Sequence, residues 1–273
     1  MSELMGNIEQ HVLKENIMKD EFGWEIPVET VPSPSQGRVY DADSVLYRRE
    51  TVKIKAMTAR EEDILSSKPL LIEGTAVDYL IRSCLIDKKI DVNNLITGDK
   101  NAIMISIRIT GYGTDYHVKS VCDNCDHNEE LIVDLSSLSI KRLGIVPVDE
   151  GKNRFLFNLP VTKKKIIFKF LNTNDERRRE RTIEFMKEHT GNIENNITSF
   201  LEESIISVEG ITDKNKIKHF INNMPALDAK KLRRHIWDNE PGIDMTHEWN
   251  CAKCSHKNKG KLPINSEFFW PTK

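Results

Sequence analysis

Cys122-Asp-Asn-Cys-Asp-His127 and Cys251-Ala-Lys-Cys-Ser-His256 repeat one pattern, C-x-x-C-x-H, at two distant places in this chain of 273 residues. Zinc prefers four soft or borderline ligands in a tetrahedron, and two C-x-x-C turns supply four thiolates at a suitable spacing. We therefore predict that one structural Zn2+ per chain is bound by Cys122, Cys125, Cys251 and Cys254. Such an ion would tie the middle of the chain to its end.

Alternating polar and apolar residues lie on both sides of each cysteine pair, at 115–121 and 128–134 and again at 244–250 and 257–263. This alternation predicts two β-hairpins, each with a cysteine knuckle at its tip, which together form a zinc ribbon. A site closed by four thiolates has no open coordination position, so we expect a structural and not a catalytic ion. Zinc binding at such sites is worth on the order of 10–16 kcal/mol. Closing so long a loop costs about 4–5 kcal/mol, so the closure is feasible.

Other roles for these residues are less favoured. A thioredoxin-like redox pair needs a strand-to-helix junction, and neither cysteine pair has a helix-like continuation. Disulfides are typical of secreted chains, and nothing marks this chain as secreted. His127 and His256 could replace a cysteine ligand or bind a second ion, but we favour a site of four cysteines alone. Cys84 lies in a predicted helix and is expected to be a small buried residue.

The composition limits the class of protein. Hydrophobic residues make up 38% of the chain, charged residues 30%, and the formal net charge is −2. These values allow one large or two small soluble domains and show no basic bias toward nucleic acid. No apolar run approaches the roughly 20 residues that span a bilayer, and the N-terminus has no signal-peptide pattern. We expect a protein that is made and first used in a cytoplasm, without a membrane partner.

Residues 1–36 are predicted to form an N-terminal arm, which begins with a short helix over 7–19. Three prolines interrupt the apolar residues that follow, so this stretch is not expected in the interior of a sheet. Exposed Phe22, Trp24 and Ile26 would suit docking on a partner protein. Packing of the same residues on the chain's own domain is equally compatible with the sequence.

The remaining patterns predict an α+β fold, with a helical core, short β-strands and the zinc-ribbon-like module. A capping box, Thr58-Ala-Arg-Glu61, marks the start of one helix. The apolar stretch 101–110 is either a strand or a buried helix, because periodicity does not distinguish the two. Strands are predicted at 37–40, 51–57 and 164–171, and helices at 58–66, 75–87, 174–189, 193–208, 214–223 and 227–238. The segments are 1–36 (arm), 37–114 (α+β), 115–172 (first hairpin and strands), 173–241 (helical) and 242–273 (second hairpin and aromatic end), in one zinc-tied unit.

No Walker, G-x-G-x-x-G, H-E-x-x-H or nucleophile-elbow motif is present, so we predict that the protein is not an enzyme. An active site that forms only in the folded chain would escape this search. Two basic runs, 163–165 and 177–179, raise the alternative of a zinc-ribbon nucleic-acid-binding protein. Acidic residues bracket the second run, as on a solvated helix face, so we do not expect nucleic acid as a partner.

Several segments together resemble the T-even-type baseplate protein family of contractile-tailed bacteriophages, whose members are described as baseplate hub subunits or hub assembly factors. The resemblance extends from about residue 34 to residue 271 and depends on the order and spacing of the segments. The family more usually has a basic residue where Trp270 stands. The segments are 34–40, 57–62, 70–84, 97–99, both cysteine pairs, 224–229 and 268–271.

The resemblance implies a non-enzymatic structural or assembly protein, acting as a subunit or a departing chaperone. It implies hub or tape-measure proteins as partners, and a place in the host cytoplasm during assembly or in the virion tail baseplate. It also favours a helix for the apolar stretch 101–110. The aromatic end, Phe268, Phe269 and Trp270, is expected to contact a partner together with the N-terminal arm.

Overall fold

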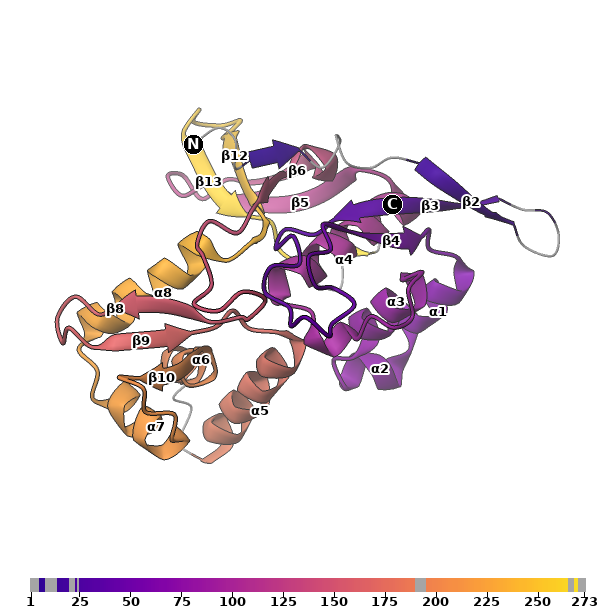
Figure 1. Cartoon of the computed structure of the whole chain (residues 1–273). Helices are drawn as coiled ribbons and strands as arrows, with labels where there is room; N and C mark the ends of the chain where they lie inside the picture. The colour runs from indigo at the N-terminus through magenta and orange to yellow at the C-terminus, as the bar shows by residue number, and fades with distance from the viewer. Residues whose placement is uncertain are drawn as a thin grey trace.

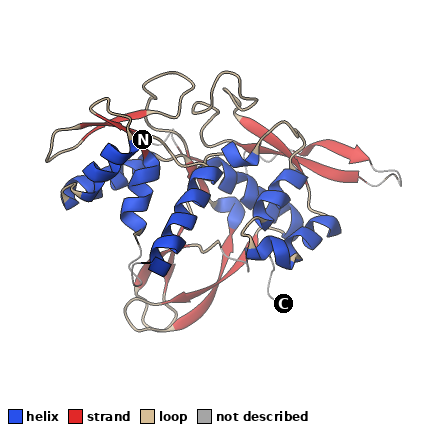
Figure 2. Cartoon of the chain, turned by 90° about the horizontal axis from the view of Figure 1, so that it is seen from below, coloured by secondary structure: helices blue, strands red, loops and turns tan. Residues whose placement is uncertain are grey.

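The structure is a computed structural model that describes residues 5–7, 14–19, 23, 25–189, 195–264 and 268–269. Within these residues α-helices accompany short antiparallel strands, so the predicted α+β class is confirmed. Figure 1 shows a first lobe (residues 25–112), a second lobe (residues 155–239) and, above them, the two hairpins that carry the cysteine pairs. In Figure 2 the helices of the two lobes lie side by side, while the hairpin of β2 (Lys14–Lys19) and β3 (Glu25–Pro32) projects from the body.

Helix α4 (Thr97–Tyr112) forms the core of the first lobe, because every residue from Ala102 to Arg108 is buried. A helix that is apolar on all sides belongs in a protein core. The helix that the resemblance favours for this apolar stretch is therefore confirmed. Helix α3 (Ala76–Cys84) packs on α4, and α1 (Ala59–Ser66) packs on α3. The lobe also contains α2 (Lys68–Ile72) and a short 3-10 helix, η3 (Val92–Asn94).

Glu61 fixes the start of α1, as the capping box predicts. Its carboxylate accepts hydrogen bonds from the N–H and the hydroxyl of Thr58, at 2.9 and 2.6 Å. The ammonium of Lys55 and the hydroxyl of Ser83 donate to its other oxygen, at 2.7 and 2.5 Å. Burial alone would raise the pKa of the Glu61 carboxyl, but these donors lower that pKa to about 2. Glu61 thereby joins α1 to α3 and to strand β4 (Thr51–Lys55).

This depressed pKa predicts how acid destabilises the first lobe. Glu61 contributes stability that is fully present above its unfolded pKa of about 4.3 and is lost as the pH falls through about 2. The contribution is roughly 2–3 kcal/mol. In Glu61→Gln, urea unfolding should lack this part of the acid dependence, whereas the exposed control Asp63→Asn should keep it. Equal acid dependence in wild type and Glu61→Gln would contradict this role.

Strand β3 (Glu25–Pro32) is the middle strand of a sheet with the order β2-β3-β4. The expectation that this proline-containing stretch stays out of a sheet interior is therefore wrong. Pro32 pairs with the first residue of β4, and Pro27 lies just beyond the last residue that β4 pairs. Both prolines lie at the ends of the β3–β4 ladder. The N–H groups that they lack therefore interrupt none of the hydrogen bonds within this ladder.

The helix predicted over 7–19 is wrong where the structure describes that segment. Strand β2 (Lys14–Lys19) pairs with β3, and β1 (Met5–Asn7) pairs with β7 (Ser139–Lys141). A short isolated helix is marginal in water, so pairing with a neighbouring strand wins. Residues 8–13 lie outside the described residues, as do Phe22 and Trp24, while Ile26 is half-buried in β3.

Residues 37–40 form turns and not the predicted strand. Gly37 has a left-handed φ of 68°, and a Cβ there would lie 2.2 Å from the carbonyl oxygen of Leu46. The chain can therefore fold back at this position only with glycine. Next to this turn, the hydroxyls of Ser35 and Tyr40 donate to the buried carboxylate of Asp99 at 2.5 and 2.7 Å. The two family-like segments 34–40 and 97–99 thus hold each other in place.

Gly98 brings the first turn of α4 against the strand that follows Pro241. A Cβ added at Gly98 would lie 1.7 Å from the carbonyl oxygen of Pro241, so Gly98→Ala must displace α4 from β11 (Gly242–Ile243). We expect a loss of about 1–3 kcal/mol in the free energy of unfolding, measured with urea. At the control position Gly144 the nearest atom would lie 3.5 Å away, and alanine there should change stability by less than about 0.5 kcal/mol. Equal stability of the two variants would contradict the close approach.

The second lobe is built on a three-stranded sheet with the order β10-β9-β8. The helix predicted over 193–208 ends early, because α6 (Asn196–Ser204) is followed by β10 (Ile205–Val208). The branched side chains of this segment fit the ladder with β9, which overrides helix propensity. Residues 193–194 lie outside the described residues. Three helices agree with prediction within about two residues: α5 (Thr173–His189), α7 (Lys214–Asn222) and α8 (Ala226–Asn239). The strand predicted at 164–171 is shorter, as β9 (Lys165–Phe168), and it pairs with β8 (Phe155–Asn158).

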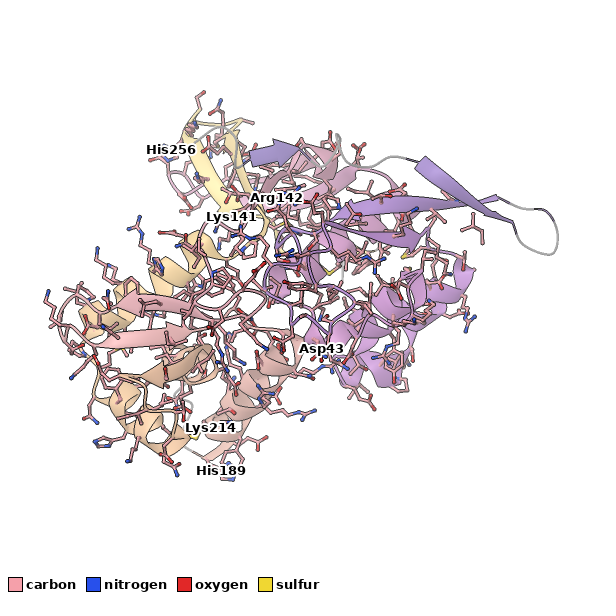
Figure 3. The ribbon with its side chains drawn as sticks, viewed as in Figure 1. Asp43, Lys141, Arg142, His189, Lys214 and His256 are labelled. Atoms are coloured by element: carbon pink, nitrogen blue, oxygen red, sulfur yellow. The ribbon has the colours of Figure 1, made fainter. Side chains whose placement is uncertain are left out.

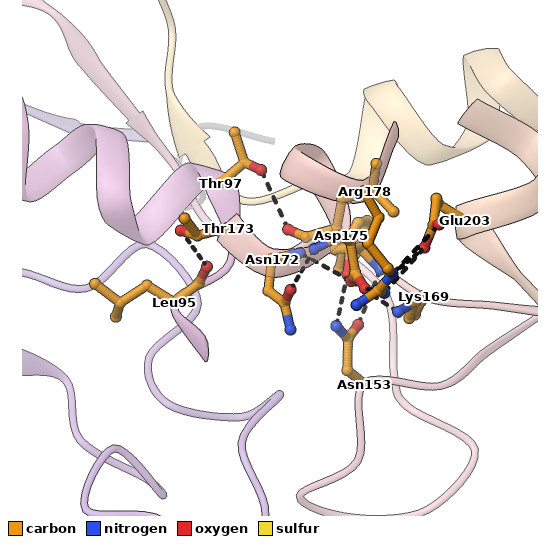
Figure 4. Close-up of polar contacts among 11 residues, drawn as sticks. Leu95, Thr97, Asn153, Lys169, Asn172, Thr173, Asp175, Arg178 and Glu203 are labelled. Carbon is orange, nitrogen blue, oxygen red and sulfur yellow. Dashed lines mark hydrogen bonds and ion pairs between the residues drawn. The ribbon is translucent and has the colours of Figure 1, made fainter. Parts of the chain in front are cut away.

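Asp175 lies where the two lobes join, 2% exposed at the start of α5. Figure 4 shows its carboxylate between Lys169, at 2.7 Å, and Arg178. Beside it, the N–H of Thr173 donates to the carbonyl of Leu95 at 3.1 Å, which ties α5 to the segment before α4. This backbone bond and the ion pair of Arg177 with Asp78 connect the two lobes.

Each arginine of the basic run 177–179 forms an ion pair with an acidic residue. Arg177 pairs with Asp78, Arg178 with Asp175 and Glu203, and Arg179 with Glu176 at 2.7 Å. Cations that are already paired contribute little to phosphate binding, so the interpretation of this run as a structural helix face is supported. A search of the described helices for an apolar span of membrane length finds none.

Candidate metal centre

The cysteine pairs lie at the tips of two antiparallel hairpins, as predicted. The first consists of β5 (Asp115–Val121) and β6 (Asn128–Asp134), and the second of β12 (Thr246–Asn250) and β13 (Lys257–Lys261). The strands pair without a register shift up to the residue next to each knuckle. Figure 1 shows the two hairpins close together at the top of the molecule, although 125 residues of chain separate their cysteines.

Both knuckles have the same backbone conformation. The N–H of Cys122 donates to the carbonyl of His127, and the N–H of Cys251 donates to that of His256, each at 2.9 Å. The residue after the second cysteine has a left-handed φ in both turns, 53° at Asp126 and 57° at Ser255. The two segments therefore form the same type of turn. In each of them both thiols point toward the other cysteine pair.

The four sulfur atoms form one cluster, within 4.8 Å of one another. Cys122 Sγ lies 3.7 Å from Cys254 Sγ, and Cys125 Sγ lies 3.7 Å from Cys251 Sγ. Zinc–sulfur bonds of about 2.3 Å in a tetrahedron place the sulfur atoms about 3.8 Å apart. The spacing of the thiols therefore fits one tetrahedral ion, and the donor set is the one that zinc prefers.

Two side chains cross between the hairpins at equivalent positions of the repeat. Asn258 is 1% exposed, and its side-chain oxygen accepts a hydrogen bond from the N–H of Asp123 at 3.0 Å. Glu129 accepts one from the N–H of Ala252 at 3.4 Å and one from the indole of Trp249 at 3.0 Å. Asn258 and Glu129 each stand four residues after the second cysteine of their own pair. These hydrogen bonds thus join the hairpins with approximate two-fold symmetry. They hold the knuckles in place and so orient the thiols.

Backbone and side-chain contacts shift the pKa values of two of these thiols in opposite directions. The N–H of His256 donates to the sulfur of Cys254 and, with the side chain of Asn124, lowers the pKa of this thiol to about 6. The N–H of His127 also lowers the pKa of Cys125, but contacts with the other sulfurs raise it to about 12. The thiolate is the form that binds metal, so Cys254 offers a first ligand and the other thiols release protons on binding.

The remaining cysteine and histidines lie outside this cluster. Cys84 is fully buried, and burial raises the pKa of its thiol to about 12, as expected for an inert core residue. His127 and His256 contribute backbone bonds to the knuckles and are not part of the four-sulfur group. Figure 3 shows His256 at the outer edge of the second hairpin.

Two residues of the aromatic end, Phe268 and Phe269, lie in the core. Phe268 and Phe269 are 0% and 2% exposed, and Phe268 packs edge-on against Tyr116 with ring centroids 5.1 Å apart. The expectation that these two side chains contact a partner is therefore corrected, because the interior of the chain already holds them. Trp270 lies outside the described residues.

A cavity of about 620 Å3 lies between the loop 39–46 and residues 152–154. Some of its polar groups take part in contacts within the chain: Lys152 pairs with Asp41 at 2.7 Å, and Asp91 accepts the N–H of Asn93 at 3.0 Å. Asp43, labelled in Figure 3, is another of its lining residues. The described lining residues include neither cysteine nor histidine.

Comparisons with known proteins add one finding. The model of a family described as T4 bacteriophage base plate protein matches residues 27–270, which include both cysteine pairs and both lobes. No curated protein and no solved structure matches the chain.

Proposed function

This chain belongs to the family of T4 bacteriophage base plate proteins, and we propose that it is a structural or assembly protein of the baseplate hub. Membership implies association with the phage tail baseplate and contacts with other baseplate proteins. Beyond this, we propose hub or tape-measure proteins as its partners, a chaperone-like or permanent role during assembly in the host cytoplasm, and no enzymatic activity. We further propose that one structural zinc ion is bound by Cys122, Cys125, Cys251 and Cys254.

The observation that carries this proposal is the position of the carboxylates in the family-like segments. Asp99, Glu61 and Asp228 are almost fully buried, and hydrogen bonds from the surrounding chain occupy them. Asp228 accepts the N–H groups of Val161 and Thr162 at 2.7 and 3.0 Å. Acids that hold loops together stabilise a rigid body, and these three carboxylates are not free for catalysis. This supports a structural role over an enzymatic one.

The zinc site and the β2–β3 hairpin suggest how the protein would contact its partners. A closed thiolate site would hold two hairpins from distant parts of the chain as one rigid surface. In Figures 1 and 2 the β2–β3 hairpin projects from the body, as an arm that a partner could bind. We keep the proposal that Phe22, Trp24 and Ile26 of this arm contact a hub protein.

Co-purification from infected cells tests the proposal. We expect the tagged protein to be recovered with hub and tape-measure proteins in tail intermediates. Mass spectrometry of finished virions separates a permanent subunit, which is present, from a chaperone, which is absent. Recovery of the tagged protein without any hub or tape-measure protein would contradict the hub assignment.

The nucleic-acid alternative predicts binding that weakens steeply with salt. The pairing of Arg177–Arg179 with acids counts against it. Binding of labelled DNA or RNA should therefore be undetectable even at about 50 mM salt, where phosphate contacts are strong.

A further inference from the structure

A cleft of about 770 Å3 lies where the end of α8 meets the start of α4 and the second hairpin. Trp237 stands at its edge with 56% of its side chain exposed, and Ile264 is 39% exposed. Met245 and Leu262 are among the apolar residues of its wall. Tryptophan usually buries its large ring, so an exposed tryptophan beside an apolar cleft is typical of a binding surface.

The exposed face of α8 continues this surface. Leu227, Lys230, Lys231, Arg234 and Trp237 recur at helical spacing and are all exposed, while Asp228, Leu232 and Ile236 are buried on the opposite face. Leu227 is 51% exposed. The face therefore presents apolar side chains at its two ends and cations between them. Lys230 and Lys231 form no ion pair with any residue that the structure describes.

Two further lysines lie at the cleft. Lys141, labelled in Figure 3, donates to the carbonyl of Trp237, and Lys261 lines the same cleft. Three acids are also present, but two of them are engaged. Asp238 pairs with Arg234 at 3.3 Å, and Asp244 accepts the N–H of Thr246 at 3.0 Å.

The third acid, Glu240, is partly neutral near pH 7, because burial raises the pKa of its carboxyl to about 7. The hydrogen bond to Asp244 leaves its charge in place, but four lysines without an ion pair among the described residues outnumber it: Lys141, Lys230, Lys231 and Lys261. The unpaired charge of the surface is therefore mainly positive, and it surrounds an apolar centre. A cationic rim around an aromatic anchor is complementary to an acidic segment that carries an apolar side chain.

We propose that the exposed face of α8 and the cleft at its end bind an acidic segment of another baseplate protein, which inserts an apolar side chain beside Trp237. This inference rests on the proposed function, because it takes the partner from the baseplate. It assigns the contact to α8 and the adjoining cleft, away from the β2–β3 arm.

Binding measurements with matched variants test the proposal. The probes are the other baseplate proteins of the same phage, each purified separately and titrated against the full-length zinc-loaded chain. Trp237→Ala should weaken the binding of one of them by about 30-fold or more, as expected for a central anchor. Lys230→Glu with Lys231→Glu should weaken it by about 10-fold, mainly at low salt.

Two control variants separate this surface from general effects. Phe185→Ala removes an aromatic ring that is 57% exposed on α5. Lys214→Glu with Lys216→Glu reverses two exposed lysines on α7, where Figure 3 labels Lys214. Both controls should bind like wild type. Melting temperature and zinc content of every variant show whether its fold is intact.

A photo-crosslinker placed at position 237 identifies the occupant. We expect cross-links to an acidic segment with an apolar residue in one baseplate protein. Cross-links to a second copy of the chain, or to a DNA duplex added as a competitor, would overturn the proposal. If wild type binds no baseplate protein, the proposed function fails. If wild type binds but both surface variants bind equally well, only the assignment of this surface fails.

Discussion

Cys251→Ser with Cys254→Ser is expected to abolish metal binding and to unfold the two hairpins. Two of the four ligands disappear, and zinc binding at such sites is worth on the order of 10–16 kcal/mol. The second hairpin has little core of its own, since no residue of β12 and only Asn258 of β13 is buried, whereas β5 of the first hairpin buries Tyr116 and Val118. An isolated two-stranded hairpin is marginal in water, so the module should lose its amide protection from hydrogen exchange. The free energy of unfolding of the whole chain should fall by several kcal/mol.

Hydrogen exchange and urea unfolding measure this effect, with Cys84→Ala as the control. Cys84 is the fifth cysteine and lies in the core, outside the sulfur cluster. Its variant should keep the metal and the protected hairpins, at a cost of about 1 kcal/mol. If the double cysteine variant keeps wild-type protection in both hairpins, a metal ion does not hold them.

Arg108→Met is expected to lower the free energy of unfolding by about 3–5 kcal/mol. The guanidinium of Arg108 is 1% exposed, and no carboxylate pairs with it among the described residues. It donates instead to three carbonyls, those of Phe268 at 2.8 Å, Gly113 at 2.7 Å and Asp115 at 3.0 Å. Methionine fills much of the space but removes all three hydrogen bonds, and it leaves the carbonyl of the buried Phe268 without this donor. The end of α4, the start of β5 and the C-terminal Phe268 should then separate.

Two further variants sharpen this test by urea unfolding. Arg108→Lys should restore only part of the loss, because one ammonium cannot reach three acceptors in the geometry of a guanidinium. Arg60→Met, at an exposed position of α1, should stay within about 0.5 kcal/mol of wild type. An Arg108→Met variant as stable as Arg60→Met would mean that this arginine does not anchor the C-terminal aromatic residues.

The hairpins and knuckles could be predicted because their signals are local. Alternation specifies each strand, and the C-x-x-C spacing specifies each turn. The crossing residues Glu129 and Asn258 were missed, although aligning the two repeats would have placed them at equivalent positions. The full site could not be predicted from either pair alone, because contacts between segments more than a hundred residues apart complete it.

The elements that were mispredicted depend on distant partners. Strands β2 and β10 are short, and each is a strand because a neighbouring strand offers it a ladder. Arg108 stands in an apolar run, and its acceptor at Phe268 lies 160 residues further along the chain. Phe268 and Phe269 were expected at a partner surface, because a sequence does not reveal that the core has a space for them. Contacts between distant segments therefore determine the secondary structure and the burial of residues that local sequence patterns do not specify.

Metal analysis of the purified protein, combined with X-ray absorption at the zinc edge, tests most directly whether one ion joins the distant cysteine pairs. We expect one zinc per chain with four sulfur ligands at about 2.3 Å, and no zinc in the Cys251→Ser, Cys254→Ser variant. A folded, metal-free protein in which Cys122, Cys125, Cys251 and Cys254 all react as free thiols would contradict the metal centre.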